Sequence, residues 1–436
     1  MRRRHFLSTF FTAAAMAQAG ETQPLTPPVL RRRATAGDWI EPDWKERVLV
    51  TVGRSKADLI GADHRVIQAA VDYVAGLGGG TVHLLPGEYR FRNAVKLRSK
   101  VRILGSGADS VCIKEPCVRT PLAENSDWYD QEITLQDPTG FQVGDGIVLR
   151  TRNPHHGGQD IHKRTLVARS GNRFRLDEML TENYWTREGA VASTLFALFD
   201  GFRVQDVVME NLCLDGNGQN NEFLNGNYVG CIFLRESNRV LLRNVEARNF
   251  NGDGLSWQVC HDVRVENCYS HGHAGYALHP GSGSQRSVVT GCTLQHCEIG
   301  FFFCWGVKWA LVENNKMLDN RSYGISIGHN DTDNVVRHNQ VERSGKVGIL
   351  LRQEHGPSFA PSRNWIEGNR VVDTGDESSV AVDIQGYTEA VTLKGNFLLE
   401  RRKPAQRIGV RISKESKQIQ LVENRIEGFA LEVSNG

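Results

Sequence analysis

The sequence predicts an all-β protein with the right-handed parallel β-helix fold, and two observations support this prediction. From about residue 200 the chain repeats with spacings of 19 to 33 residues. Each repeat contains short runs of alternating apolar and polar residues separated by polar turns, and none contains a segment with helical periodicity. These features exclude helical repeat proteins and favour a solenoid of stacked β-strands.

One phase of the repeat is a small residue that opens a short alternating strand. In successive repeats this residue is Gly230, Gly254, Gly275, Gly300, Gly324, Gly348, Ala381, Gly409 and Gly428. The positions one and three residues later are apolar in nearly every repeat, as in Leu255 and Trp257, so we expect them to face inward. The positions two and four residues later then face outward.

A second phase places an asparagine in a turn after another short strand. These asparagines are Asn211, Asn244, Asn267, Asn315, Asn339, Asn369, Asn396 and Asn424, and Cys292 occupies the position in one repeat. A side-chain amide can both donate and accept, so stacked asparagines can satisfy one another and the turn backbone. We expect a single internal column with a structural role, which includes Asn244, Asn267, Cys292, Asn315 and Asn339.

The N-terminal part predicts a helix that closes one end of the solenoid. Residues 62–91 read ADHRVIQAAVDYVAGLGGGTVHLLPGEYRF, in which Val66, Ile67, Ala70, Val71 and Val74 form a helical stripe before a glycine run and a strand. This segment resembles the opening of the pectate-lyase-like proteins of the pectin-lyase-like superfamily, in which a helix caps the first coil. Together with the repeats, the resemblance covers about three quarters of the chain.

An insertion interrupts the repeat, because WYDQEITLQDPTGFQVGDGIVLRT and RSGNRFRLDEML indicate a small antiparallel β unit with hairpin turns. The predicted organisation is an export signal over residues 1–19, a flexible lead-in over 20–45 and a single β-helix domain over 46–436. The insertion occupies about residues 129–185 of that domain.

The first residues have the layout of a cleavable export signal, with a basic start, a short apolar run and AQA at residues 17–19. RRHFL at residues 3–7 is similar to a twin-arginine signal, which predicts a periplasmic or secreted bacterial protein. An ordinary secretory signal with extra arginines is the alternative.

Charge and cysteine usage exclude several classes of protein. Removal of the signal would remove three arginines and change the formal charge from +2 to −1, which gives no long-range field for nucleic acid. No later run is apolar and long enough for a membrane helix. The nine cysteines are scattered, so a disulfide framework is not expected, and only Cys112 and Cys117 are placed for a local bridge.

The outward positions of the glycine-phased strands carry an unusual density of chemically active side chains. They include Ser256, Gln258, His279, Phe302, Ser326, Arg352 and Asp383, with Trp305, His329, Asp331, Gln353 and Glu354 directly after the strands and Asp253 before one of them. The loop over residues 353–364 is long for one coil, and long loops on a rigid scaffold often carry function.

The stacking distance divides these residues into two groups. One group follows strands of adjacent coils, which lie roughly 4.8 Å apart, and can converge. It comprises His329, Asp331, Arg352 and Glu354. His279 is three coils from Arg352, roughly 14 Å between backbones, so these two cannot form a direct acid–base pair. Trp305 and Phe302 can offer an apolar face to a sugar ring.

The resemblance implies several reactions, and two of them do not fit the motifs. NGDG at residues 251–254 is similar to the first aspartate motif of polygalacturonases, but the next coil lacks the aspartate pair that follows in that family. GYALHPG at residues 275–281 keeps the proline and histidine of the alginate-epimerase motif Tyr-Gly-Xaa-Asp-Pro-His but lacks its aspartate.

A polysaccharide lyase needs a base for the proton alpha to a uronate carboxyl, a cation that neutralises this carboxyl, and a proton donor for the leaving oxygen. His329 can act as the base and Arg352 as the carboxylate clamp, with His279 or Tyr323 as an auxiliary group. Asp331 and Glu354 would fit a hydrolase equally well.

The sequence therefore predicts an exported enzyme that cleaves a uronate-containing polysaccharide by β-elimination. A glycoside hydrolase with paired carboxylates is one alternative, and a non-catalytic glycan-binding or structural β-helix protein is another. The predicted catalytic residues are His329, Asp331, Arg352, Glu354, His279 and Asp253, and the predicted substrate-binding residues are Gln258, Phe302, Trp305, Tyr323 and Gln353.

The predicted partner is a polysaccharide or oligosaccharide substrate, without nucleic acid and without a membrane span. No metal or other cofactor is predicted. The resemblance allows a calcium ion, but the sequence offers no convincing set of oxygen ligands. Because the unusual residues are confined to a few consecutive coils, an enzyme is favoured over a binding protein.

Overall fold

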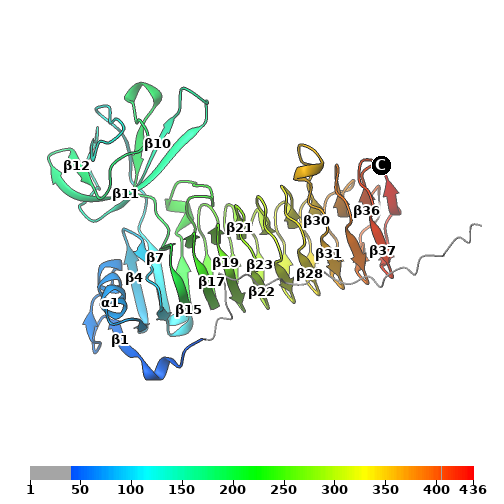
Figure 1. The fold of residues 1–436 in the computed structure, drawn as a ribbon, viewed down its shortest axis with the longest axis horizontal. Helices are drawn as coiled ribbons and strands as arrows, with labels where there is room; N and C mark the ends of the chain where they lie inside the picture. The colour runs from blue at the N-terminus through cyan, green and yellow to red at the C-terminus, as the bar shows by residue number, and fades with distance from the viewer. Residues whose placement is uncertain (1–40, 404) are drawn as a thin grey trace, which may run out of the picture.

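The computed structural model describes residues 41–403 and 405–436, which form an elongated parallel β-helix (Figure 1). The coils stack along the long axis, with the N-terminal helix at one end and the C-terminus at the other. The predicted export signal and most of the predicted lead-in lie outside the described residues. None of the helices in the described part has the length and apolar character needed to cross a bilayer.

A sheet of 22 strands forms two sides of the solenoid, and its parallel pairings make two ladders. The first ladder runs through β1 (Val48–Gly53), β3 (Gly80–Leu84), β6 (Val101–Leu104), β15 (Gln205–Asp215), β17 (Asn238–Arg248), β19 (His261–Glu266), β22 (Val288–Thr290), β25 (Leu311–Glu313), β28 (Val335–Arg337), β31 (Trp365–Glu367), β34 (Thr392–Lys394) and β37 (Gln420–Val422). The second contains β4 (Gly87–Phe91), β7 (Ser110–Lys114), the same β15 and β17, β20 (Tyr269–His271), β23 (Thr293–Gln295), β26 (Lys316–Leu318), β29 (Gln340–Glu342), β32 (Arg370–Val372), β35 (Phe397–Leu399) and β38 (Arg425–Glu427). The short β2 (Leu59–Ile60) pairs with β1.

The predicted glycine-phased strands form the third side, a parallel sheet of 11 strands. In order they are β5 (Val95–Lys96), β14 (Phe199–Phe202), β16 (Ile232–Arg235), β18 (Leu255–Gln258), β21 (Tyr276–Gly281), β24 (Ile299–Phe302), β27 (Tyr323–Ile327), β30 (Val347–Leu351), β33 (Val380–Ile384), β36 (Ile408–Ile412) and β39 (Leu431–Asn435). The prediction that these strands stack as one parallel sheet is confirmed.

The register of this sheet differs from the predicted one in some coils. Leu255 pairs with Leu278 and Ser256 with His279, so Gly275 is displaced by two residues from the phase of Gly254. A shift of two residues keeps every side chain on the same face of a strand, so His279 still points outward as predicted. The shift places His279 beside Ser256, whereas the alignment predicted from Gly254 and Gly275 places it beside Gln258.

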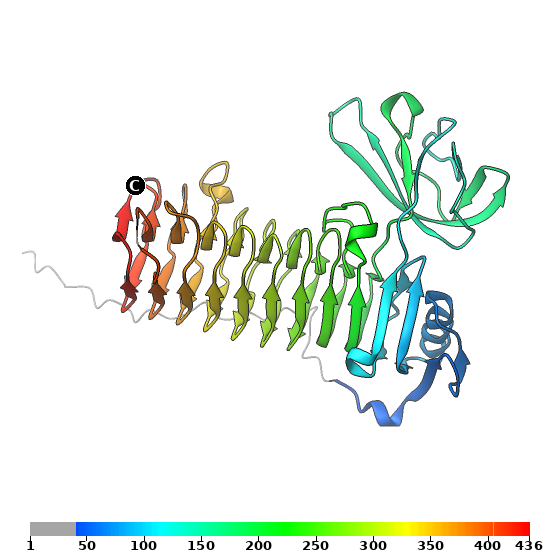
Figure 2. The ribbon, with the colours of Figure 1, turned by 180° about the vertical axis from the view of Figure 1, so that it is seen from behind.

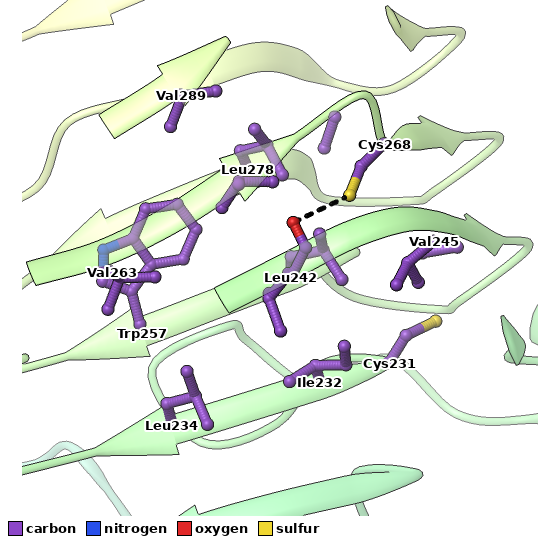
Figure 3. Packing of buried hydrophobic residues seen from close by; sticks show 14 of the residues in the cluster. Cys231, Ile232, Leu234, Leu242, Val245, Trp257, Val263, Cys268, Leu278 and Val289 are labelled. Atoms are coloured by element: carbon purple, nitrogen blue, oxygen red, sulfur yellow. Dashed lines mark hydrogen bonds between the residues drawn. The ribbon is translucent and has the colours of Figure 1, made fainter. Parts of the chain in front are cut away.

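The interior is filled by the inward side chains of all three sides. Figure 3 shows Leu234, Trp257 and Leu278 from neighbouring coils packed together, and each is fully buried. At the N-terminal end, α1 (His64–Gly76) covers the first coil with Ile67 and Val71, as the helical stripe predicted. Asp63 caps the helix by accepting hydrogen bonds from the backbone of its first turn.

The asparagine column is shorter than predicted. Asn315, Asn339, Asn369, Asn396 and Asn424 form a continuous ladder in which each side-chain amide donates to the next, at 2.9–3.0 Å. Cys292 precedes the ladder, since its backbone N–H donates to the Asn315 side chain. Asn244 and Asn267 do not belong to the column, and both are exposed with φ of 52°. Asn244 lies within β17 and its side chain donates to Asn211 Oδ1 at 3.1 Å, apart from the ladder.

The difference has a simple physical cause, because asparagine serves two purposes in these turns. Asparagine tolerates the left-handed region better than most residues, so it also occurs at the position that precedes the column. In the coil of Asn267 the buried column position is taken by Cys268, which donates to the Leu242 carbonyl (Figure 3).

The insertion is an antiparallel sheet of six strands that is wider than predicted. It runs from β8 (Arg119–Pro121) through β9 (Glu132–Thr134), β10 (Gly146–Arg152), β11 (Gln159–Ser170) and β12 (Arg173–Leu176) to β13 (Val191–Ser193). It has a hydrophobic core of its own, which includes Ile133, Leu149, Phe174 and Leu180. Figures 1 and 2 show it projecting from one side of the solenoid near the N-terminal end.

All nine cysteines are free. Cys112 is buried in the core, while the Cys117 thiol points to the Val118 carbonyl, so the possible local bridge between them is not formed. Burial raises the pKa of Cys260 and of Cys297 to about 12, which keeps these thiols protonated and unreactive at neutral pH.

Candidate functional site

The predicted site residues lie on the outward side of the 11-stranded sheet and at the carboxyl ends of its strands. One outward row contains Ser256, His279, Phe302, Ser326, Leu350 and Asp383 in consecutive coils. Two elements stand beside this row, namely the insertion at one end and the loop of residues 353–364 towards the other (Figure 2).

His329 follows β27 and is held between two aromatic rings. The Trp305 ring stacks on it at 4.8 Å between centroids with an interplanar angle of 23°. The Phe359 ring covers the other side at 4.7 Å and 37°. Phe359 belongs to the 3-10 helix η5 (Pro357–Phe359), and its carbonyl accepts a hydrogen bond of 2.7 Å from the Asn330 backbone. These contacts restrict the imidazole to one plane while its edge remains partly exposed.

Glu354 lies against the edge of this imidazole. Its Oε2 is 3.5 Å from His329 Nδ1, and its Oε1 is 3.6 Å from Arg352 Nε. A carboxylate at Nδ1 favours the tautomer that carries the proton on Nδ1 and leaves Nε2 free to accept one. The prediction that these three residues converge is therefore matched by the geometry.

Arg352 is anchored more tightly than a surface arginine. Its Nη1 donates to Ser326 Oγ at 2.8 Å and its Nη2 donates to the Phe303 carbonyl at 3.0 Å. The guanidinium lies over the Phe302 ring, with Cζ at 4.5 Å from the ring centroid. Gly328 leaves room for it, because a Cβ at this position would overlap the guanidinium and force it to shift. The side chain keeps 20 % exposure, so part of its charge faces solvent.

Asp331 does not belong to the solvent-accessible group, contrary to prediction. Its side chain is fully buried, and its two oxygens accept hydrogen bonds of 2.8 Å from the backbone of Val307 and Gly328. Burial raises its pKa to about 6, an effect that the Arg352 guanidinium at 3.7 Å partly offsets. The aspartate fixes the turn beneath Arg352 and cannot reach a substrate.

The second predicted group, Asp253 and His279, forms a close pair that is also buried. His279 Nδ1 lies 2.7 Å from Asp253 Oδ2, and the two side chains are 1 % and 3 % exposed. Asp253 Oδ1 accepts a hydrogen bond of 2.9 Å from the Tyr276 backbone. Neither residue is accessible to a polymer in this structure, so the prediction of a direct catalytic role for them is not supported by their position.

The loop of residues 221–230 covers this buried pair. Ser256 Oγ donates to the Gly226 carbonyl at 2.6 Å, and Gly226 lies so close to Asp253 that a Cβ there would overlap the carboxylate. Gln258, predicted to bind substrate, is 4 % exposed and donates to Ser256 at 3.1 Å. His279 Nε2 and Gln258 Oε1 are buried without a hydrogen-bond partner.

The other predicted substrate-binding residues are divided. Trp305 is 62 % exposed and Gln353 is exposed, so both can contact a substrate near His329. Phe302 lies between the two groups, 5.2 Å from the His279 ring and beneath Arg352. Tyr323 begins β27 whereas His329 follows its end, a separation of roughly 20 Å along an extended strand. Tyr323 therefore cannot assist His329.

Phe359 is the site residue that sequence analysis missed. The length of the loop over residues 353–364 pointed to this region, but nothing in the local pattern shows that Phe359 returns to cover His329. Among the described residues, no group of three or more His, Cys, Asp or Glu side chains is arranged to hold a metal ion.

Comparison with known proteins supports the architecture. A family model described as a right-handed β-helix region matches residues 230–398. The A-module of mannuronan C-5 epimerase AlgE4 from Azotobacter vinelandii superposes with a TM-score of 0.54 at 14 % identity, covering 88 % of this chain and 97 % of that chain. The fold is a right-handed parallel β-helix.

Another similar structure is the surface adhesin PfbA of Streptococcus pneumoniae, with a TM-score of 0.52 at 13 % identity, covering 85 % of this chain and 88 % of that chain. The sequence has no significant match among curated proteins. These likenesses confirm the fold that the pectate-lyase-like segment implied, and at this identity they carry no information on the reaction.

Proposed function

We propose that this protein is an exported polysaccharide lyase that cleaves a uronate-containing glycan by β-elimination, with His329 as the catalytic base. The observation that carries the proposal is the arrangement of His329 between Trp305 and Phe359 with its Nδ1 directed to Glu354. A base that is oriented by a carboxylate and partly exposed on a rigid scaffold meets the first requirement of the reaction.

The proposed reaction assigns a task to each accessible group. His329 Nε2 takes the proton alpha to the uronate carboxyl, and the electron pair of the broken C–H bond forms the new double bond. The bond to the glycosidic oxygen breaks at the same time, and this oxygen leaves as a hydroxyl after taking a proton from solvent. The exposed part of Arg352 neutralises the substrate carboxylate and so stabilises the charge that develops on it. Trp305 offers its exposed ring to the apolar side of a sugar.

A hydrolase with paired carboxylates is less well supported. Such an enzyme needs two carboxyl groups that can both reach the glycosidic bond. Of the two carboxylates near Arg352, Asp331 is fully buried with both oxygens engaged by backbone N–H groups, and only Glu354 reaches the surface. A non-catalytic glycan-binding protein remains the alternative from another class.

Incubation with a panel of polysaccharides tests the proposal. Alginate, polygalacturonate, a glucuronate-containing xylan and a neutral β-glucan would be followed by ultraviolet absorbance of the unsaturated product and, separately, by reducing ends. We expect both signals to rise together on a uronate polymer. Reducing ends without absorbance would indicate hydrolysis, and binding without either signal would indicate a glycan-binding protein.

Export through the twin-arginine route is part of the same proposal. Changing Arg3 and Arg4 to lysine should retain the precursor in the cytoplasm, because that route reads the arginine pair. Unchanged export of the variant would indicate the general secretory pathway.

A further inference from the structure

A turn of the insertion presents two large aromatic rings to solvent, far along the solenoid from His329. Trp128 and Tyr129 are 46 % and 73 % exposed, and their ring centroids lie 6.0 Å apart with an interplanar angle of 60°. Rings of this size are normally buried, where they contribute most to stability. Neither ring serves the core of the insertion, which is complete without them.

The turn that carries these rings is held from both sides. The Tyr129 backbone N–H donates to the Leu180 carbonyl at 3.0 Å, and the Leu180 N–H donates to the Asp130 carbonyl at 2.8 Å. The Trp128 N–H donates to Asn183 Oδ1 at 2.9 Å. The backbone beneath the rings is therefore fixed, so a ligand that binds there need not order a flexible loop.

Tyr129 occupies the left-handed region, with φ of 74°. A residue with a Cβ costs roughly 1–2 kcal/mol in this conformation, which glycine avoids and asparagine tolerates. A tyrosine whose ring is mostly in solvent regains little of that cost by packing. Positive φ recurs at many non-glycine turn residues of this chain, so the exposure of the two rings, rather than the backbone conformation, distinguishes this turn.

A polar cleft lies directly beside Tyr129. It has a volume of about 330 Å³ and is lined by Glu124, Asn125, Gln131, Glu132, Arg173 and Arg175 in addition to Tyr129. The lining offers both hydrogen-bond donors and acceptors, and its charges are partly paired, as between Arg173 and Glu132 at 3.0 Å. Such a lining is suited to a ligand with many hydroxyl groups.

We propose that the Trp128–Tyr129 turn and this cleft form an accessory glycan-binding site. The rings pack against the apolar faces of sugar residues, and the cleft hydrogen-bonds their hydroxyls. A protein partner fits less well, because a stable interface needs about 800 Å² from each side. Here two rings are bordered by polar groups such as Asp127, Asp130 and Asn183.

The position of the insertion on the solenoid indicates how a glycan bound there could also reach the proposed catalytic site. The insertion and loop 353–364 project from the same side of the solenoid in both views (Figures 1 and 2). Because Phe359 of this loop contacts the His329 ring, a polymer held at the insertion can extend along this side towards His329. The choice of a uronate polymer as ligand rests on the proposed function, whereas the site itself follows from the geometry of the insertion.

Affinity electrophoresis of the full chain tests the site, with alginate, polygalacturonate or a neutral β-glucan cast in the gel. We expect at least one polymer to retard the wild type, and W128A/Y129A to weaken that retardation at least tenfold in Kd. Tyr73→Ala is the matched control, because Tyr73 is 58 % exposed on α1 and should leave retardation unchanged. His329→Ala should also be retarded normally, which separates this site from the proposed catalytic one.

Either of two retardation results, or one result in light scattering, would overturn the accessory site. The retardation results are no retardation of the wild type by any of the three polymers, and equal retardation of the wild type and W128A/Y129A. The light-scattering result is a wild-type dimer that W128A/Y129A converts to a monomer, since the rings would then contact a second copy of this chain. If retardation behaves as expected but no polymer is cleaved, the proposed lyase activity fails and the accessory site stands.

Discussion

The outward side of the 11-stranded sheet carries two pairs of a histidine and a carboxylate, and they differ in exposure. In the pair His329–Glu354 the side chains are 24 % and 13 % exposed, with 3.5 Å between Nδ1 and Oε2. In the pair His279–Asp253 they are 1 % and 3 % exposed, at 2.7 Å. Similar chemical groups are thus brought together twice by the stacking of coils.

The loops beside the two pairs account for the difference. Loop 353–364 stands next to His329 and contributes Phe359 to one side of its ring, whereas loop 221–230 lies over Asp253 through Gly226. The comparison teaches that residue type and coil position do not determine which pair a substrate can reach in this fold. Exposure, which the loops determine, does.

The largest expected effect is the loss of stability on removal of the buried histidine. His279→Ala leaves the Asp253 carboxylate buried without its partner, which should lower the free energy of unfolding by about 3 kcal/mol. His329→Ala should change it by no more than about 0.5 kcal/mol, because its partners are partly exposed. Urea denaturation measures the free energy of unfolding of both variants. Similar losses of stability in the two would contradict the distinction between a buried and an exposed pair.

Asp331 should behave as a buried structural residue despite its place in the exposed group. Asp331→Ala leaves two buried backbone N–H groups unpaired, and we expect a loss of about 3 kcal/mol. The control is Asp333→Ala, which breaks a more exposed ion pair of 2.8 Å with Arg363 and should cost within about 1 kcal/mol. A stable Asp331→Ala variant that is inactive would instead place Asp331 in the catalytic machinery.

The raised pKa of Asp331 also predicts a dependence of stability on pH. The folded protein binds this proton more tightly than the unfolded chain, since the pKa is about 6 rather than 3.8. Its contribution is therefore present at acid pH and is lost as the pH rises from about 4 through about 6. The free energy of unfolding of the wild type, measured against that of Asp331→Asn, should fall as the pH rises through this window. If the two free energies change with pH in parallel, the raised pKa of Asp331 is contradicted.

A smaller loss is expected within the asparagine ladder. Asn369→Ala removes the acceptor of the Asn339 backbone and side chain, both at 3.0 Å, and should cost about 2 kcal/mol. Asn267→Gly should be nearly neutral, because Asn267 is an exposed turn residue with positive φ, which glycine adopts freely. Thermal unfolding of the two variants tests which asparagines belong to the column. Equal losses of stability in the two variants would indicate that Asn267 belongs to it.

The smallest of these effects concerns the orientation of the proposed base. Glu354→Gln should lower kcat about tenfold with little change in KM, because it removes the carboxylate charge 3.5 Å from His329 Nδ1, a contact that contributes about 1.5 kcal/mol. His355→Ala, in the same loop and exposed, is the control. A wild-type kcat in Glu354→Gln would exclude an orienting role.

Much of the fold could be predicted, because its signals are local and repeated. The helical stripe that includes Ile67 and Val71, the inward Leu255 and Trp257, and the outward His279 all follow from periodicity along the chain. Register could not be predicted fully, since a shift of two residues at Gly275 preserves the alternation. Asn267 was misplaced because one residue type suits both the left-handed turn and the ladder.

The candidate site could be predicted only in part. Coil position brought His329, Arg352 and Glu354 together correctly, because residues after adjacent strands of a stacked sheet must lie close. Burial of Asp331 and Asp253 depends on which backbone groups and loops meet them, and no local pattern reports that. The return of Phe359 onto His329 depends on the path of a long loop for the same reason.

The most direct test of the account is the rate of unsaturated product formation by His329→Ala and by His279→Gln, on the polymer that the wild type cleaves. Both would be assayed well below their unfolding temperatures, so that the folded fraction is the same. We expect the rate of product formation by His329→Ala to fall at least about 100-fold, which is the lower end of the contribution that a general base makes to a reaction rate. We expect His279→Gln to keep most of the wild-type rate. Full activity in His329→Ala together with loss in His279→Gln would contradict the account and assign the chemistry to the buried pair.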